Sequence, residues 1–324
     1  MALQAGSVTI KTSGGTYSSW AAFWDDIGDL TGNITCTVDA SAFTETTAPA
    51  VVTESLNGHT LHVKPSTFPT TTDASTGARF TCSYTPATGY NILTMSMEGS
   101  GSVIIEGLVF IQGTDRPNYA FFTSNIATSF SFTLRRNIVK GCNYGYTNSD
   151  STLNNDLKLY NNIFYNNVYN GMRGAVDLTN ALIANNTFVD CAVRGLDVNG
   201  YNLTVQNCIA YDSSSYDIWG TADATGYNNA SGDATGEDAD WNIGSDNLTS
   251  ISDPFNALAS DDFTITAEGD IGNAGKDLSA SFTDDFFGVT RDNWTIGACE
   301  YVTPPFYSVS VVGSRDIQYH NINS

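Results

Sequence analysis

The chain has 324 residues, of which 15% are charged, and its formal net charge is −21 at pH 7. This charge argues against nucleic acid and anionic membranes as partners, because binding to their phosphates requires Lys and Arg side chains. No apolar run approaches the roughly 18 residues of a membrane span, and the opening MALQAGSVTI has neither the basic start nor the apolar centre of a signal peptide.

The N-terminal part begins with a predicted strand at residues 7–10 and a predicted helix at residues 19–30, which Ser18 or Ser19 can cap. The apolar residues of this helix have the spacing of one helix face: Trp20, Phe23, Trp24 and Ile27. An amphipathic helix can cover the open apolar end that the first coil of a solenoid exposes. We therefore expect both Trp side chains in the core rather than on a ligand platform.

Residues 34–97 contain short alternating segments such as TLHVKP and ARFTCSY, which long polar links separate. Alternation of apolar and polar residues predicts strands. The links predict irregular first turns, with loops that could carry an interface. The regular coil is expected to begin at Val103–Ile111.

A nine-residue sequence motif occurs in four related copies between residues 134 and 213: LRRNIVKGC, LYNNIFYNN, IANNTFVDC and VQNCIAYDS. The copies begin 25, 24 and 22 residues apart, at Leu134, Leu159, Ile183 and Val205. A fainter copy begins at Ile105. Self-similarity at this period is the signature of stacked repeats.

The columns of this alignment predict the structure of each repeat. The middle of each copy holds β-branched and aromatic residues, which are typical of strands. The two columns before it are rich in Asn, which tolerates left-handed backbone and suits tight corners: Asn161, Asn185 and Asn207 in one, and Asn137, Asn162 and Asn186 in the next. Amides stacked about 4.8 Å apart would bond along the stack as a structural ladder. A second short segment follows each copy, so about three strands per turn predict an all-β fold, a parallel β-helix.

The six cysteines are dispersed along the chain and show no CxxC spacing. Cys142 and Cys191 share a column but lie two turns apart, with Asn167 between them. We expect buried free thiols that pack as small apolar groups. A solenoid core of this kind needs no metal and no cofactor.

Beyond Trp219 the pattern degrades, and Tyr227-Asn228-Asn229 forms a last faint corner. The Asp- and Gly-rich run at residues 233–246 offers the oxygen ligands that suit Ca²⁺ but lacks the spacing of an EF-hand. A solvated loop is the favoured interpretation, and a calcium site is the alternative. Residues 253–298 contain short apolar segments that are expected to close the coil.

The last segment, residues 302–324, begins with Pro304-Pro305 and is more apolar than a typical disordered tail. Such a segment is either a strand laid back on its own coil or an arm placed on a neighbouring subunit. We favour the arm. The expected interface residues are Pro304, Phe306, Tyr307, Val309, Val311, Ile317 and Tyr319.

The closing region resembles that of known proteins. It holds an Asp-Phe strand at 262–263, a Gly-Asn-Ala-Gly turn at 272–275, a Gly-x-x-Arg at 288–291 and an Ile-Gly-Ala-x-Glu strand at 296–300. This order is similar to the end of many right-handed parallel β-helix proteins with the pectate-lyase-like superfamily fold. Their usual Ser-Pro-Ala-Ile-Asp is replaced here by Glu-Gly-Asp-Ile at 268–271.

The opening, residues 7–40, resembles the start of β-helix proteins that are common in tailed-phage and prophage genomes. Together the two resemblances imply a right-handed coil and a location in the virion, with secretion as the alternative. They imply little about chemistry, because this fold carries lyases, hydrolases, adhesins and inert virion parts.

Two sets of charged residues are candidates for catalysis. Asp190 and Asp212 share a column, so adjacent turns would place them roughly 5 Å apart, as in a retaining glycosidase. Any two acids in one column would satisfy this spacing. Arg173, Asp197 and Asp217 are predicted to share a column on the segments that follow the corners.

The three histidines lie outside the repeat. His59 and His62 fall around the strand TLHVKP, where residues three apart point to opposite faces, so a metal-binding pair is not expected. Calcium-dependent pectate lyases of the resembled fold need several acidic ligands and a basic proton acceptor, and that set cannot be assembled from this sequence.

The sequence thus predicts four parts: a capping helix with irregular turns at 1–100, regular coils at 101–230, closing coils at 231–301 and an arm at 302–324. We expect a non-catalytic structural virion protein of a tailed phage, which decorates the capsid or forms a short fibre. Its partners would be other virion proteins and further copies of itself. The alternative is a carbohydrate-active enzyme or a receptor-binding tailspike that binds surface polysaccharide.

Overall fold

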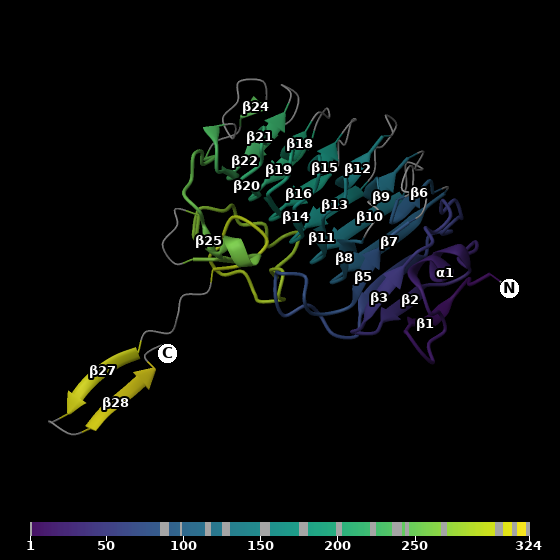
Figure 1. Ribbon diagram of the computed structural model, residues 1–324, viewed down its shortest axis with the longest axis horizontal. Helices are drawn as coiled ribbons and strands as arrows, with labels where there is room; N and C mark the ends of the chain where they lie inside the picture. The colour runs from purple at the N-terminus through teal and green to yellow at the C-terminus, as the bar shows by residue number, and fades with distance from the viewer. Residues whose placement is uncertain are drawn as a thin grey trace.

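The computed structural model describes most of the chain. The described residues are 2–84, 91–97, 99–113, 118–124, 130–149, 156–174, 181–198, 203–220, 225–234, 242–243, 246–266, 271–301, 307–312 and 316–321, with backbone alone for 242–243, 307–312 and 316–321. Most strands in these ranges stack in parallel into three sheets, which Figure 1 shows as successive turns of one coil.

The first sheet has ten strands, in the order β1 (Gly6–Ile10), β2 (Ile34–Val38), β4 (Thr60–Pro65), β7 (Gly101–Glu106), β10 (Phe130–Arg135), β13 (Asp156–Tyr160), β16 (Leu182–Ala184), β19 (Thr204–Gln206), β22 (Thr225–Tyr227) and β24 (Asn242–Ile243). The second sheet has eight: β3 (Ala42–Glu45), β5 (Arg79–Cys82), β8 (Val109–Gln112), β11 (Ile138–Lys140), β14 (Ile163–Tyr165), β17 (Thr187–Val189), β20 (Ile209–Tyr211) and β23 (Ala230–Ser231). The third has six: β6 (Leu93–Met95), β9 (Tyr119–Thr123), β12 (Tyr144–Asn148), β15 (Asn170–Gly174), β18 (Arg194–Val198) and β21 (Tyr216–Gly220).

The register confirms the repeat that the sequence predicts. Leu134 pairs with Leu159, Leu159 with Ile183, and Ile183 with Val205, each in parallel. The early strands β1, β2 and β4 also pair in parallel in the first sheet, so the first turns predicted before Val103 belong to the same coil. Long polar links between these early strands hide their period from the sequence.

The interior of the coil is a stack of apolar side chains, one layer per turn. Phe43, Phe80 and Phe110 stack at centroid distances of 4.9 and 5.5 Å. All six cysteines are free and buried, as predicted. Burial raises the pKa of the Cys142 thiol to about 12, which keeps the thiol protonated and unreactive at neutral pH.

The predicted N-terminal helix is present but short. Helix α1 spans Trp20–Asp25, and the Ser19 side chain caps it by accepting from the Ala22 amide. It ends early because the backbone that follows bonds to residues 3 and 4 instead: the Leu3 amide donates to the Asp26 carbonyl at 2.6 Å. The Trp20 ring lies 5.0 Å from that of Phe80 and 5.2 Å from that of Phe110.

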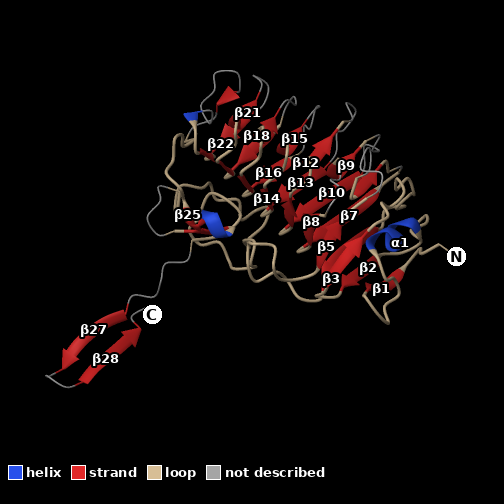
Figure 2. Cartoon of the chain, in the orientation of Figure 1, coloured by secondary structure: helices blue, strands red, loops and turns tan. Residues whose placement is uncertain are grey.

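Residues 246–301, here called the covering segment, do not close the coil, and that prediction is wrong. β25 (Phe255–Ala257) pairs antiparallel with β26 (Asp262–Ile265), and the described residues 271–301 run mainly as turns. At its start Leu248 still pairs in parallel with Ala230 of β23, but neither later strand of the described segment, β25 or β26, belongs to the three parallel sheets. Figure 2 shows the segment as tan loop that passes beside the coil. Its apolar side chains form a second core with the outer face of the second sheet.

The second sheet requires this cover because its outer face is apolar. Val109, Ile138 and Ile163 form a column there, which Ile209 continues beyond Thr187, and these four apolar residues are fully buried. Phe263, Phe286 and Ile296 of the covering segment pack in the same cluster. Burying a Val, Leu or Ile side chain contributes about 1.5–3 kcal/mol, so this column stabilises the segment on the coil.

A buried ion pair holds the end of the covering segment in place. Arg291 Nη1 lies 3.1 Å from Glu300 Oε2, and the two side chains are 0% and 3% exposed. The Arg291 guanidinium also donates to the carbonyls of Gly297 and Ala298. The Gly-x-x-Arg and Ile-Gly-Ala-x-Glu stretches of the sequence therefore form one buried network, and the strand expected at 296–300 is absent.

The two Asn columns have different partners. The second is a ladder along the stack, in which Asn137 Nδ2 donates to Asn162 Oδ1 and Asn162 Nδ2 to Asn186 Oδ1. The first column instead binds the covering segment, apart from one bond from Asn207 to Asn185. Its amides donate to the carbonyls of Asp284, Thr295 and Lys276, from Asn161, Asn185 and Asn207 respectively.

The C-terminal segment forms a hairpin. β27 (Tyr307–Val312) pairs antiparallel with β28 (Asp316–Asn321), and neither strand belongs to a sheet of the coil. Pro304 and Phe306 lie outside the described residues. The side chains of the other expected interface residues are likewise not described: Tyr307, Val309, Val311, Ile317 and Tyr319.

Candidate functional site

Asp190 and Asp212 sit at equivalent corners of adjacent turns. They follow β17 and β20, whose last residues, Val189 and Tyr211, are paired in register. Both adopt a left-handed backbone, with φ of 48° and 60°, and Asn166 does the same one turn earlier at 54°. Asp and Asn are the non-glycine residues that tolerate this conformation best, so the shared column has a structural cause.

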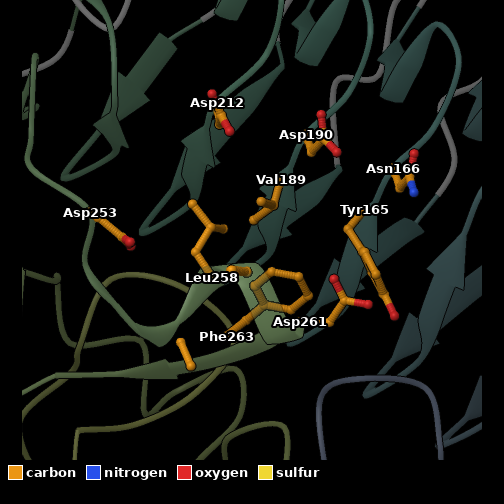
Figure 3. A pocket seen from close by; sticks show the side chains of 11 residues that line it. Tyr165, Asn166, Val189, Asp190, Asp212, Asp253, Leu258, Asp261 and Phe263 are labelled. Carbon is orange, nitrogen blue, oxygen red and sulfur yellow. The ribbon is translucent and has the colours of Figure 1, made fainter.

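A pocket opens between these corners and the covering segment. Its volume is about 600 Å³, and the coil contributes Tyr165, Asp190 and Asp212 to its wall. The opposite wall contains Asp253, Asp261 and Phe263, together with the 3₁₀ turn at Leu258–Ser260. Figure 3 shows carboxylates on both walls around the apolar side chains of Leu258 and Phe263.

The charges of this pocket repel one another. Burial raises the pKa of the Asp190 carboxyl, and the nearby Asp212 and Asp261 charges raise it further. Lys140 offsets part of this charge, because its Nζ lies 2.8 Å from Asp261 Oδ2 and 4.8 Å from the centre of the Tyr165 ring.

This arrangement supports two kinds of chemistry. A carboxyl whose pKa is raised is a candidate general acid, and a second carboxylate one turn away could act as a base or nucleophile. The same side chains are also acceptors for ammonium groups or sugar hydroxyls. Asp190 and Asp212 are exposed at the corner, whereas catalytic carboxyls with strongly raised pKa values lie in apolar surroundings. The geometry therefore favours binding over acid catalysis.

The predicted column of Arg173, Asp197 and Asp217 is wrong in its last member. Arg173 pairs with Asp197, but Asp197 pairs with Trp219. Asp217 is two residues earlier on β21 and is 2% exposed. It binds across the last turn, where its Oδ2 accepts from the Asp233 amide at 3.0 Å and the Asp217 amide donates to Asp233 Oδ2 at 3.1 Å.

A charged cluster that the sequence analysis missed lies on the first sheet. Glu106 is 5% exposed, and its Oε2 lies 3.0 Å from His62 Nε2 and 2.8 Å from Arg135 Nη2. Burial raises the pKa of the Glu106 carboxyl, but hydrogen bonds from His62 and Arg135 outweigh burial and leave the pKa below its usual range. The strand register is the signal that could have revealed this cluster, because it makes Glu106 and Arg135 direct cross-strand partners.

This cluster reaches the covering segment through Arg136. Arg136 Nη1 lies 3.7 Å from Glu106 Oε1 and 3.6 Å from Asp284 Oδ2, and its Nε donates to the Phe286 carbonyl at 2.9 Å. The guanidinium also lies 4.1 Å from the centre of the Phe68 ring. His62 thus belongs to a network that fastens the segment to the coil.

The outer face of the third sheet carries aromatic rings and paired charges. The Tyr119, Tyr144 and Tyr169 rings stack in series at 5.1 Å. Further along the coil, the Arg194 guanidinium lies 4.0 Å from the centre of the Trp219 ring, and Arg194 Nη1 is 2.7 Å from Asp197 Oδ2. Two of the four exposed large hydrophobic residues of the described chain, Tyr169 and Tyr216, are on this face.

Metal sites and known relatives offer no further guide to function. The described residues contain no group of three His, Cys, Asp or Glu side chains that could hold one metal ion. Most of the run that suggested calcium, residues 235–241 and 244–245, lies outside the described residues. No helix of the described chain is long and apolar enough to span a bilayer.

Comparisons with protein-family models, curated proteins and solved structures find no match to this chain.

Proposed function

We propose that this protein is a non-catalytic structural component of a tailed-phage virion, a right-handed β-helix that decorates the capsid or forms a short fibre. The observation that carries the proposal is the way the covering segment is fixed along the coil. The Asn amides of the first corner column bond its backbone carbonyls, and its buried Arg291, which pairs with Glu300, also donates to the Asn161 side chain of the coil. These contacts stiffen the coil.

The resemblance of the opening stretch to tailed-phage β-helix proteins supports the virion location. Helix α1 supports a closed N-terminal end, because Trp20 and Phe23 are fully buried. The hairpin β27–β28 follows the covering segment and supplies a candidate attachment arm. Attachment through a terminal arm would leave the coil itself without contacts to the particle.

The experiment is to find the protein in particles. Antibodies raised against the purified coil would be used to label gradient-purified particles from a culture that expresses the gene. Regular labelling of the particle surface is the expected result. Protein found only in the soluble fraction would reject the virion role.

A second candidate function, glycan binding by a receptor-binding spike, is favoured by the outer face of the third sheet. Flat aromatic rings can pack against the C–H faces of sugars, and paired Arg and Asp groups can bond vicinal hydroxyls. Tyr119 and Tyr216 are four turns apart on this face, or about 19 Å at the spacing of parallel strands. This is room for an oligosaccharide.

The two candidates are separated by an assay with surface polysaccharides purified from the phage's host. We expect no cleavage, because the geometry at Asp190 and Asp212 favours binding over acid catalysis. Cleavage that is lost in both Asp190→Asn and Asp212→Asn would establish an enzyme. Binding without cleavage that is lost in Tyr169→Ala would establish a spike.

A further inference from the structure

The acidic pocket beside the covering segment carries negative charge that the described residues do not balance. Four aspartates line it, and only Asp261 has an ion-pair partner in the described part of the chain, Lys140. No Lys, Arg or His of the described residues pairs with Asp190, Asp212 or Asp253. A cation would relieve the repulsion between these carboxylates.

The aromatic wall of the pocket is suited to a cation as well. Tyr165 is 1% exposed, and its buried hydroxyl lies beside the Asp261 carboxylate. The rings of Tyr165 and Phe263 meet edge to face at 4.8 Å. Lys140 already holds an ammonium group over the Tyr165 ring, which shows that this wall accepts cation–π contacts.

The shape of the pocket favours an extended cation over a single ion. Its volume of about 600 Å³ far exceeds one ion. The carboxylates of Asp190 and Asp212 come from the coil, whereas that of Asp253 comes from the opposite wall, with Leu258 between them in Figure 3. Positive charges joined by an alkyl chain match acidic groups separated by apolar surface.

We propose that this pocket binds a linear polyamine, with one ammonium group at Asp190 and Asp212 and another at Asp253. The alkyl chain lies along Leu258 and Phe263, beside the aromatic ring of Tyr165. This binding role goes beyond the structural role in the virion and does not depend on it.

Calorimetric titration of the full chain with spermidine tests the proposal, in about 150 mM NaCl to suppress long-range attraction to the acidic protein. Saturable binding of one spermidine per chain is expected. The Asp190→Asn/Asp212→Asn double variant should weaken it by about tenfold or more. Asn is compatible with the left-handed backbone at both positions, since Asn166 occupies the equivalent corner.

The matched control is Asp156→Asn/Asp292→Asn, which removes the same charge from two exposed residues that do not line the pocket. It should bind spermidine like the parent chain. Equal loss in both double variants would show that spermidine senses only the net charge and would overturn the proposal. Absence of saturable binding, or displacement of spermidine by Mg²⁺ at equal concentration, would also overturn it.

Discussion

Asn side chains of the first corner column fasten the covering segment to the coil. Asn185 is fully buried, and its Nδ2 donates to the Thr295 carbonyl at 2.9 Å and the Gly297 carbonyl at 3.2 Å. Asn185→Ala should therefore lower the free energy of unfolding by roughly 1–3 kcal/mol, because it leaves these buried carbonyls unpaired. Chemical denaturation measures the change.

The control for this substitution is Asn166→Ala. Asn166 has a similar φ, 54° against 48°, but it is exposed. Its replacement reports the cost of placing Ala in a left-handed conformation. Equal losses in the two variants would show that the amide of Asn185 contributes nothing beyond the turn.

Arg291 is the most deeply buried cation of the described chain, with a side chain that is 0% exposed. Arg291→Met should cost about 3–5 kcal/mol, because Glu300 would remain charged and buried without its partner. Thermal and denaturant unfolding provide the measurement, with Arg79→Met on β5 as the control. A loss below about 1 kcal/mol would mean that the pair does not hold the segment.

Asp217 should make stability depend on pH. Burial, followed by the Asp233 charge, raises the pKa of its carboxyl to about 6, against about 3.9 in an unfolded chain. The folded state thus binds the proton more tightly, so the stabilisation is complete below about pH 4 and is lost as pH rises through about 6.

The difference in unfolding free energy between the parent and Asp217→Asn, measured from pH 4 to pH 7, isolates this carboxyl from other titrating groups. The difference should change by on the order of 1–3 kcal/mol over this range. A difference that is constant with pH would show that Asp217 titrates normally.

Among the elements, the covering segment and β20 should be energetically coupled. A Cβ at Gly297 would lie 2.5 Å from Ile209 Cδ1, and Gly297 has a φ of +101° that L side chains rarely adopt. Gly297→Ala should destabilise the protein, and Ile209→Val should relieve the clash but not the backbone strain. A double-mutant cycle should give a coupling of about 0.5–3 kcal/mol. Additive effects of the two substitutions on the free energy of unfolding would show that the segment and the sheet are not energetically coupled.

The coil was predictable because each turn repeats the same pattern of inward and outward residues. The covering segment was not, because many of its contacts join residues more than 100 positions apart and have no period. Asn185 to Thr295 is one such contact. The Asn columns were visible, but the sequence does not distinguish amides that bond one another from amides that bond a distant carbonyl.

The candidate site was predictable only in part. Asp190 and Asp212 were placed together correctly because they immediately follow paired strands. Asp217 was misplaced because the fourth copy lacks the Gly that aligned the others. Counting 22 residues from Asp197, the spacing of Ile183 and Val205, leads to Trp219. Asp253 and Asp261 come from the covering segment, which no repeat could place in the pocket.

At the scale of the whole molecule, the protein combines a coil of three parallel sheets with a C-terminal hairpin that belongs to none of them. The coil has its own core, which runs from Val8 to Ile218, and the covering segment adds a second. The strands β27 and β28 pair only with each other among the described residues. A rod of this kind can be placed on a particle through the hairpin without any change in its own fold.

The most direct measurement of this account compares particles assembled with the full chain and with a chain lacking residues 303–324. Quantitative mass spectrometry of gradient-purified particles gives the number of copies, and circular dichroism checks that the truncated coil is folded. We predict that the full chain is present in a fixed number of copies and that the truncated chain is folded, soluble and absent from particles. Equal incorporation of the two chains, or a truncated coil that unfolds, would contradict the account.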